Sequence, residues 1–377
     1  MKIVDLDFAL LSSPYCQPER WRSYGVAVVR TEDGRVGVGE PYAGVNLPVV
    51  CREAVTALRP LFIDQDATQI DALMKHAHAT VEYFDHRGLV CCVLGAIDWG
   101  LHDLASQRAG LPMHRFLNPC SAAGIELYAS TGVIGWSIAE TVNEIHRRIA
   151  EGYRCIKIRV GCGQRDADEA IARTEAIVNA ANGRARIAVD AGQQVFLRKF
   201  WTFSDALRVM SALGAMGICF LEDPYLITDR QAYRRLRDVG GAPIAGGEMF
   251  NRAEEFDSYF SAGALDVAQP DASVLPGPAA SLRVAEAARK HGVRLIMHGW
   301  AGPIAQLQNI HIALAAGNCE MVEYCPLLHP LLVDGLAPVW RFADGRLEAP
   351  TAPGIGAAAI DDLLLRYPFK ENQSLIA

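Results

Sequence analysis

Short apolar runs rich in Val and Ile recur from about residue 125 onward, at intervals of roughly 23 to 33 residues. They are IELYAST, CIKIRVG, RIAVDAG, ICFLEDP, PIAGGEM, LDVAQPD, VRLIMHG and EMVEYC. Amphipathic segments with helical spacing, such as DEAIARTEAIVNAA and SDALRVMSALGAM, lie between them. This alternation predicts eight parallel strands closed into a barrel with an outer ring of helices.

The first part of the chain, before the barrel pattern begins, reads as α plus β. VDLDFALLSS and SYGVAVVRTEDGRVGVGEPYAG predict two strands, a turn at Asp33-Gly34 and a third strand. Helical stretches follow, and the last of them, LVCCVLGAIDWGLHDLASQRAG, ends at Gly110. The loop-rich tail contains one short strand, RFADGRLEAP, and we expect it to pack back on the first part.

Composition places the chain among ordinary globular proteins. Its 377 residues are 51% hydrophobic, which supports a sizeable core. The net charge is −7 without a basic run, so we expect neither nucleic acid nor a membrane as a partner. The N-terminal MKIVDLDFALLSS is too short in its apolar part for a secretion signal, and the ten cysteines lack a Cys-x-x-Cys spacing. We therefore expect a cytoplasmic protein.

The run CIKIRVG places two cations on one face of its strand. Lys157 and Arg159 alternate there with Ile156 and Ile158. In a closed barrel this face points inward, where an unpaired charge is costly. Something anionic must therefore meet these two side chains.

Ionisable residues stand at or just past the ends of the strands after the first, where the chemistry of such barrels is located. They are Lys157, Arg159, Asp190, Glu222, Glu248, Asp271, His298 and Glu323. A single Asp or Glu in this place is more often a helix N-cap than a ligand, but here seven successive strands carry an ionisable group. Asp223, directly before Pro224, has the pattern of such a cap, which leaves Glu222 for chemistry.

Two kinds of chemistry are indicated at this mouth. Asp190, Glu222 and Glu248 lie on three adjacent predicted strands, and a triad of hard oxygen ligands suits Mg²⁺ before Mn²⁺. On the opposite side, Asp271 and His298 come from neighbouring strands, so the carboxylate can hold one imidazole nitrogen and raise the basicity of the other. His298 is therefore a candidate general base.

Together these residues resemble the enolase superfamily and, within it, the mandelate racemase subgroup. The similarity covers essentially the whole chain, including VGVGEPYAG, LGAIDWGLHDLASQRAGLPMHRFLN and the ordered strand-end set. It implies an α/β protein with a (β/α)7β modified TIM barrel, residues 121–330. It also implies an α+β capping domain formed by residues 1–120, on which a C-terminal segment, residues 331–377, packs back.

The resemblance also implies roles. It places Mg²⁺ on three carboxylates: Asp190, Glu222 and Glu248. The His298–Asp271 dyad removes or delivers a proton, Glu323 hydrogen-bonds the substrate carboxylate as it becomes an enediolate, and Lys157 neutralises that carboxylate. Physical chemistry agrees, because a proton α to a carboxylate is very weakly acidic and the developing dianion needs cations. A Lys or His base with Mg²⁺ is the pairing known for this superfamily.

Two positions depart from the subgroup. Its usual second Lys, a base on the face opposite the His, is Arg159 here, and Arg is a poor base. Relatives commonly have Asn two residues after the first metal ligand, where this chain has Gly192. A racemase needs a base on each face, and the missing Asn enlarges the pocket.

We expect dehydration of a sugar acid to a 2-keto-3-deoxy acid, with His298 abstracting the α-proton and returning a proton to the departing β-hydroxide. In another arrangement, Arg159 acts deprotonated or through water and His298 serves only as the acid. Racemisation, epimerisation and lactone cycloisomerisation are alternatives within the family, and they form product without loss of water.

Other classes fit less well. A muconate-type cycloisomerase has Lys where this chain has Asp271. An amidohydrolase-type barrel wants His-x-His at the first strand end, where this chain has Tyr128, Ala129 and Ser130. A non-catalytic binding protein would lose stability by keeping so many ionisable groups at one mouth.

The segment SSPYCQPERWRS contains candidates for substrate recognition. Tyr15, Arg20, Trp21 and Arg22 suit a polyhydroxylated anion, although a solvated loop has the same composition. The expected partner is a small-molecule carboxylate, and aldonates, aldarates and their lactones all remain open. The resemblance also implies a homo-oligomer, a dimer or larger.

Overall fold

The computed structural model describes residues 1–377 except 84, 86, 133–134, 162–165, 194–200 and 372–377. The N-terminal part holds an antiparallel sheet of β1 (Ile3–Tyr15), β2 (Gln17–Thr31) and β3 (Val36–Gly39). The turn before β3 is the expected one, because Gly34 has a φ of +83° and donates its N–H to Thr31 O at 2.9 Å. The helical segments that follow are α1 (Ala43–Asn46), α2 (Pro48–Leu58), η1 (Arg59–Leu61), α3 (Ile70–Val81), α4 (Leu89–Ala109) and α5 (Met113–Leu117).

Helix α4 packs directly on β3 because glycines face it. A Cβ on Gly37 would lie 2.1 Å from Gly100 O, and one on Gly39 would lie 2.0 Å from Ala96 O. Only a residue without a side chain permits this approach. By length and composition α4 could cross a membrane, but 78% of its apolar window is buried inside the protein. It is the core helix of the N-terminal part, and it ends at Gly110 in the left-handed conformation, as predicted.

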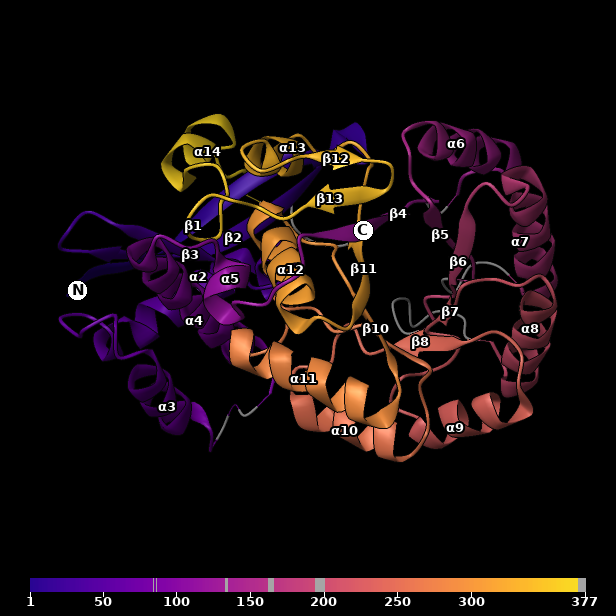
Figure 1. Cartoon of the computed structure of the whole chain (residues 1–377), viewed down its shortest axis with the longest axis horizontal. Helices are drawn as coiled ribbons and strands as arrows, with labels where there is room; N and C mark the ends of the chain where they lie inside the picture. The colour runs from indigo at the N-terminus through magenta and orange to yellow at the C-terminus, as the bar shows by residue number, and fades with distance from the viewer. Residues whose placement is uncertain (84, 86, 133–134, 162–165, 194–200, 372–377) are drawn as a thin grey trace.

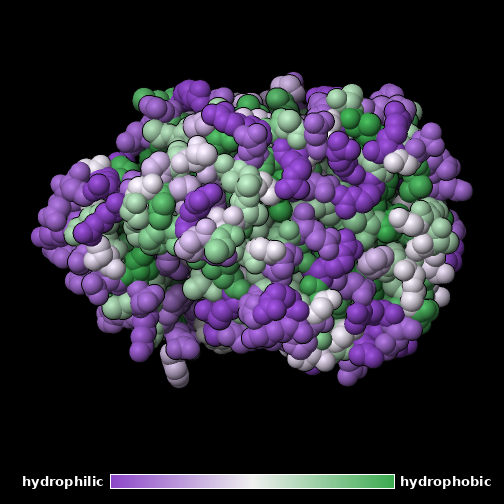
Figure 2. All heavy atoms as spheres, viewed as in Figure 1, coloured by the Kyte–Doolittle hydropathy of each residue, from purple (hydrophilic) through white to green (hydrophobic). Residues whose placement is uncertain are grey.

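Eight parallel strands form the predicted barrel, and pairing of β11 with β4 closes it. Strands and helices alternate as β4 (Gly124–Ser130), α6 (Ile138–Ala150), β5 (Cys155–Arg159), α7 (Ala167–Ala181), β6 (Arg186–Asp190), α8 (Phe203–Ala215), β7 (Leu221–Glu222), α9 (Arg230–Val239), β8 (Ile244–Gly246), α10 (Ala253–Ser261), β9 (Val267–Ala268), α11 (Pro278–His291), β10 (Arg294–Met297), α12 (Pro303–Ala316) and β11 (Cys319–Tyr324). Figure 1 shows the indigo N-terminal sheet beside this ring. Figure 2 shows hydrophilic and hydrophobic side chains intermixed over the same face.

One buried side chain from each barrel segment fills the interior below the strand ends. These side chains are Tyr128, Cys155, Ala188, Phe220, Ala245, Val267, Ile296 and Met321. They form a cluster separate from the main core, which lies between the strands and the outer helices and continues into the N-terminal sheet. We call these eight residues the barrel floor. Lys157 stands one inward position above Cys155, so the ionisable groups lie directly on this apolar layer.

The tail differs from the single short strand expected on the first part. It contains α13 (Pro330–Leu336), β12 (Phe342–Ala343), β13 (Arg346–Glu348) and α14 (Ile360–Arg366). β12 and β13 form a hairpin, and β13 pairs antiparallel with β4 of the barrel. Asp344 and Gly345 both have positive φ, as this tight turn requires. The residues after the hairpin do reach the N-terminal sheet, where Lys370 N donates to Ser12 Oγ at 3.0 Å.

Candidate active site

The carboxyl ends of the barrel strands bring the predicted residues to one mouth. Arg159 is in register with Asp190, and Asp190 with Glu222, so the ends of β5, β6 and β7 lie level. Glu323 stands on β11, whereas Glu248, Asp271 and His298 follow β8, β9 and β10. Because successive parallel strands end at the same rim, residues far apart in sequence become neighbours here.

Lys157 is buried and lies between two carboxylates. Its Nζ is 2.8 Å from Glu222 Oε2 and 2.8 Å from Glu323 Oε1. Burial by itself lowers the pKa of Lys157, but Glu222, Glu323 and Asp190 outweigh it and raise the pKa above its usual value. The anions that meet the inward cations of CIKIRVG therefore include the protein's own side chains, which the sequence interpretation did not foresee.

Arg159 is held on two sides. Its Nε lies 3.2 Å from Asp190 Oδ2, and its guanidinium carbon lies 4.0 Å from the centre of the Trp300 ring. A planar guanidinium stacks well on an aromatic face and stays protonated. The sequence analysis missed Trp300, because this residue lies two positions past His298 in a loop without the helical or strand periodicity on which the predictions rest.

The carboxylates at the mouth are crowded. Burial raises the pKa of Glu222 to about 8, since the opposing effect of Lys157 is offset by Asp190, Glu323 and Glu248. Burial likewise raises the pKa of Asp190, although Lys157 and Arg159 oppose it. Gln269 Nε2 also donates to Glu222 Oε2 at 2.6 Å. Like charges this close repel one another unless cations lie beside them, as Lys157 and Arg159 do here.

Asp223 is not the predicted helix cap. Helix α9 begins only at Arg230, and Asp229 caps it by accepting from Ala232 N at 2.9 Å. Asp223 is buried with a φ of +45° and accepts a hydrogen bond from Tyr233 Oη at 3.3 Å. Burial, followed by repulsion from Glu248 and Glu222, raises its pKa well above the usual value. It is a further member of the carboxylate group.

The three predicted metal ligands each turn toward a cation. Glu222 pairs with Lys157, Asp190 with Arg159, and Glu248 Oε2 lies 3.3 Å from His298 Nε2. Across the described residues, no three His, Cys, Asp or Glu side chains form a ready metal site. The donor set is nevertheless all oxygen and mutually repelling, which is the chemistry that a hard divalent cation fits.

His298 and Asp271 form the expected hydrogen-bonded pair. His298 Nδ1 lies 2.7 Å from Asp271 Oδ2. Asp271 Oδ1 accepts from Ser273 N at 2.8 Å, from Ser273 Oγ at 2.6 Å and from Asn309 Nδ2 at 3.0 Å. Burial lowers the pKa of His298, but Glu248, Glu323 and Asp271 together raise it to about 10. Nε2 thus carries the proton while it faces these carboxylates.

Glu323 completes the ring of charges between Lys157 and the dyad. Its Oε2 lies 3.8 Å from His298 Nε2 and accepts from Gly299 N at 3.4 Å. Burial raises the pKa of Glu323, but Lys157 and His298 outweigh it and lower the pKa to about 2. The carboxylate is therefore ionised in this arrangement.

The N-terminal sheet supplies aromatic and cationic groups above the mouth. Arg22 Nη1 donates to Trp300 O at 2.9 Å, and the Tyr15 ring meets the Trp300 ring edge-on at 6.1 Å. Tyr42, which sequence reasoning missed, has its ring centre 5.9 Å from that of His298.

The other two loop candidates are Trp21 and Arg20. Trp21 packs under Lys370 Nζ at 3.1 Å, and Arg20 is exposed. The segment therefore brings two of its four candidates, Tyr15 and Arg22, to the Trp300 loop.

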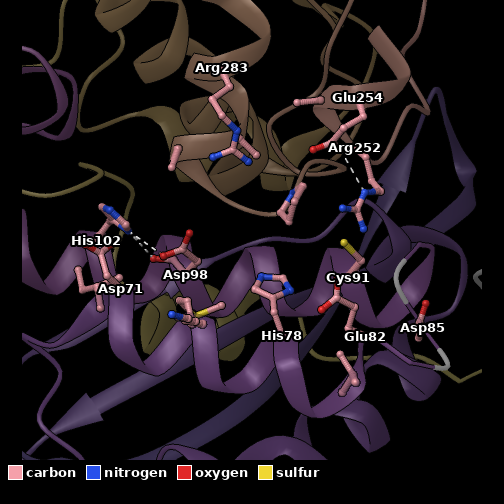
Figure 3. A pocket seen from close by; sticks show the side chains of 18 residues that line it. Asp71, His78, Glu82, Asp85, Cys91, Asp98, His102, Arg252, Glu254 and Arg283 are labelled. Atoms are coloured by element: carbon pink, nitrogen blue, oxygen red, sulfur yellow. Dashed lines mark hydrogen bonds and ion pairs between the residues drawn. The ribbon is translucent and has the colours of Figure 1, made fainter. Parts of the chain in front are cut away.

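A cavity of about 350 Å³ opens elsewhere, between α3 and α4 on one side and α10 and α11 on the other (Figure 3). Its lining contains none of the strand-end residues. Charges in it already pair, Asp98 with His102 at 3.0 Å and Arg252 with Glu254 at 3.2 Å. This cavity therefore lies apart from the ionisable residues at the barrel mouth.

Comparisons with known proteins agree with this architecture. Residues 140–363 match the family described as enolase C-terminal domain-like, and residues 20–118 match the mandelate racemase / muconate lactonizing enzyme N-terminal domain. An arabinonate dehydratase of Saccharolobus solfataricus is 27% identical over 91% of this chain and 90% of its own. A D-galactarolactone cycloisomerase of Agrobacterium fabrum is 25% identical over 92% and 91%.

A solved structure has the same fold. The crystal structure of the 3,6-anhydro-D-galactonate cycloisomerase from Zobellia galactanivorans superposes with a TM-score of 0.87 at 23% identity, covering 98% of this chain and 100% of that one. The two family matches together span both the N-terminal part and the barrel. The chain is therefore an enzyme of the enolase superfamily and belongs to its mandelate racemase / muconate lactonizing enzyme family.

Proposed function

We propose that this enzyme removes the proton α to the carboxylate of a sugar acid and expels the β-hydroxyl group, forming a 2-keto-3-deoxy acid. The observation that carries the proposal is the His298–Asp271 pair at 2.7 Å, facing Lys157 and a group of carboxylates across one barrel mouth. The relatives named above include a sugar acid dehydratase, which supports the same reaction.

In this mechanism His298 serves as the acid/base group through Nε2. Asp271 holds Nδ1 and so fixes which nitrogen faces the substrate. Before it can act as a base, Nε2 gives up to solvent the proton that it carries beside Glu248 and Glu323. It then takes the proton from C2, and the imidazolium so formed protonates the C3 hydroxyl, which leaves as water. The resulting enol becomes the ketone in solution or in the site. Lys157, between Glu222 and Glu323, offsets the negative charge that develops on the substrate carboxylate.

Asp190, Glu222 and Glu248 would hold Mg²⁺. When bound, this ion supplies positive charge that stabilises the carboxylate as it becomes an enediolate. The crowding of these carboxylates, and the raised pKa values of Asp190 and Glu222, support a cation at this place. In the present arrangement these carboxylates pair with Lys157, Arg159 and His298, and each carboxylate has a second oxygen that could bind the ion.

Arg159 favours a reaction that uses one face of the substrate. It stays protonated, and its contacts with Asp190 and Trp300 fix it opposite the dyad. A dehydration in which one residue both removes and returns a proton needs no second base. Lactone cycloisomerisation is the second candidate, because relatives of this activity match nearly the whole chain.

The substrate class is a small polyhydroxylated carboxylate, and Tyr15 and Arg22 are the loop residues best placed to contact it, through the Trp300 loop. Trp21 and Arg20 have weaker claims, since one packs under Lys370 and the other is exposed. A homo-oligomer in the cytoplasm, without nucleic acid or membrane partners, remains our prediction from sequence.

Proton NMR in D₂O tests the reaction. The protein is incubated with Mg²⁺ and pooled four- to six-carbon sugar acids, with EDTA and His298→Asn as controls. A deuterated 2-keto-3-deoxy acid, absent from both controls, supports dehydration and names the substrate. Deuterium exchange or isomer formation without loss of a hydroxyl group would instead show that the enzyme is an isomerase and not a dehydratase. If His298→Asn keeps full activity, His298 is not the acid/base residue of the mechanism.

A further inference from the structure

Glu40, directly after β3, reaches from the N-terminal part into the barrel. Its side chain is buried and accepts three backbone hydrogen bonds, from Gly302 N at 2.7 Å, Ile304 N at 3.2 Å and Ala305 N at 3.0 Å. These are donors at the start of α12, where a helix favours an anion. Burial raises the pKa of Glu40 to about 7, although the three N–H donors oppose this.

Helix α12 in turn holds the dyad. Asn309 Nδ2 donates to Asp271 Oδ1 at 3.0 Å, and Asn309 Oδ1 accepts from Ala272 N at 2.8 Å. Gln306 Nε2 donates to Glu323 O at 2.8 Å. The short loop that begins at His298 ends at Gly302, which Glu40 binds. One helix therefore carries contacts to Asp271, to the Glu323 strand and to the loop of His298.

A second contact from the same segment reaches the other half of the dyad. Tyr42 N donates to Ser273 O at 2.9 Å, and Ser273 N and Oγ both donate to Asp271. Residues 40–42 thus bind the loop after β9 through Tyr42 and the start of α12 through Glu40. The two loops that supply His298 and Asp271 are bridged by one short piece of the N-terminal part.

We propose that Glu40 is a positioning residue for the His298–Asp271 dyad: it fixes α12 and the His298 loop against the N-terminal part, so that the imidazole meets the substrate in a reactive geometry. This inference rests on the proposed function of the dyad. Glu40 does not contact the substrate. It acts through α12, and a shift of about 1 Å in a reacting group costs about 10²-fold in rate.

Three variants test this role at pH 8, where the wild-type carboxyl is ionised. Glu40→Ala removes the acceptor, and Glu40→Gln keeps the shape and one acceptor oxygen. Asp103→Asn is the matched control, because Asp103 is also buried and accepts from Val38 N at 3.0 Å, on the same strand, and from Ile355 N at 2.8 Å. It therefore loosens β3 while the hydrogen bonds of Glu40 to the start of α12 stay in place.

The first readout is turnover. Glu40→Ala should lower kcat by about 10- to 100-fold with KM changed by less than about threefold, and Glu40→Gln should recover part of the loss. Asp103→Asn should keep kcat within about twofold. An equal loss of kcat in Asp103→Asn and Glu40→Ala would overturn the proposal, because the effect would then be general loosening of β3.

The second readout needs no substrate, and so separates this proposal from the proposed function. Amide hydrogen exchange is followed in peptides covering residues 299–306 and 271–275. In both Glu40 variants exchange should accelerate in the first peptide and, through Asn309, in the second. If the 271–275 peptide exchanges at the wild-type rate in Glu40→Ala, the coupling to Asp271 does not exist. If wild type shows no turnover with any acid, the proposed function fails while this result still stands.

Discussion

The guanidinium carbon of Arg159 lies 4.0 Å from the centre of the Trp300 indole ring, while Arg159 Nε lies 3.2 Å from Asp190 Oδ2. The position where the subgroup usually has a second lysine base therefore carries a cation that is stacked as well as paired. Trp300 belongs to the loop that begins at His298, so the loop of the proposed acid/base residue also fixes the group on the opposite side of the mouth.

Trp300→Leu should lower kcat/KM by about tenfold, because Arg159 loses a contact worth about 1 to 2 kcal/mol when desolvated. Trp300→Phe keeps an aromatic face and should lose less. Steady-state kinetics with the substrate found by NMR measures both. Equal losses in the two variants would show that size, and not stacking on Arg159, matters at this position.

The dyad should behave as one unit. We expect His298→Asn to lower the rate of α-proton exchange by at least about 10²-fold. Asp271→Asn should lower this rate nearly as much, because His298 Nδ1 loses its carboxylate acceptor. The double variant should be little worse than His298→Asn alone. Additive losses, measured as deuterium incorporation in D₂O, would mean that the two residues act separately.

Removal of the Lys157 charge should destabilise the fold. Lys157→Met leaves Glu222 and Glu323 buried without their cation, which costs about 3–5 kcal/mol in the free energy of unfolding. Urea denaturation measures this loss. Arg186→Met, which breaks a half-exposed pair with Glu126, should change the same quantity by no more than about 1 kcal/mol. Similar losses in both variants would contradict the buried network.

Stability should fall in acid partly through His311. Burial lowers the pKa of His311 to about 3, whereas an unfolded histidine titrates near about 6.5. At a pH between these two values, His311 binds a proton in the unfolded chain but not in the folded chain. His311 therefore leaves the free energy of unfolding unchanged above about pH 6.5. As the pH falls from there toward 3, it lowers that free energy by about 1.4 kcal/mol per pH unit.

His311→Gln tests this pH dependence. Urea unfolding between pH 7 and pH 4.5 should show a shallower loss of stability in this variant than in wild type. The exposed His76 supplies the control variant, His76→Gln, which should keep the wild-type slope. If His311→Gln also keeps it, another group causes the acid sensitivity.

Much of the barrel could be predicted because its signals are local and repeated. A short apolar run marks each strand, and parallel strands place their last residues at one rim, so topology predicts that Lys157, Glu222 and Glu323 lie at the same mouth. The ion pairs among these three residues were not foreseen. Asp344-Gly345 is a turn signal that the prediction of a single strand overlooked, and pairing of β13 with β4 depends on a contact across more than two hundred residues.

The errors and omissions share a different cause. Asp223 before Pro224 has the local pattern of a cap, yet tertiary packing buries it among carboxylates. Glu40, Tyr42 and Trp300 lie in connecting segments, and their partners come from other parts of the chain. The contacts of these residues form only when segments that are far apart in the sequence meet in the folded chain.

The barrel floor determines from which side substrate and product can enter and leave the barrel. Eight side chains, one from each strand segment and led by Tyr128 and Phe220, close the barrel beneath Lys157 with no accessible surface. Within the described part of the chain, this floor closes the end of the barrel away from the strand ends, so we expect substrate to enter, and product to leave, at the mouth where the strands end. Substrate and product then share one entrance, so product has to leave the mouth before the next substrate molecule can bind.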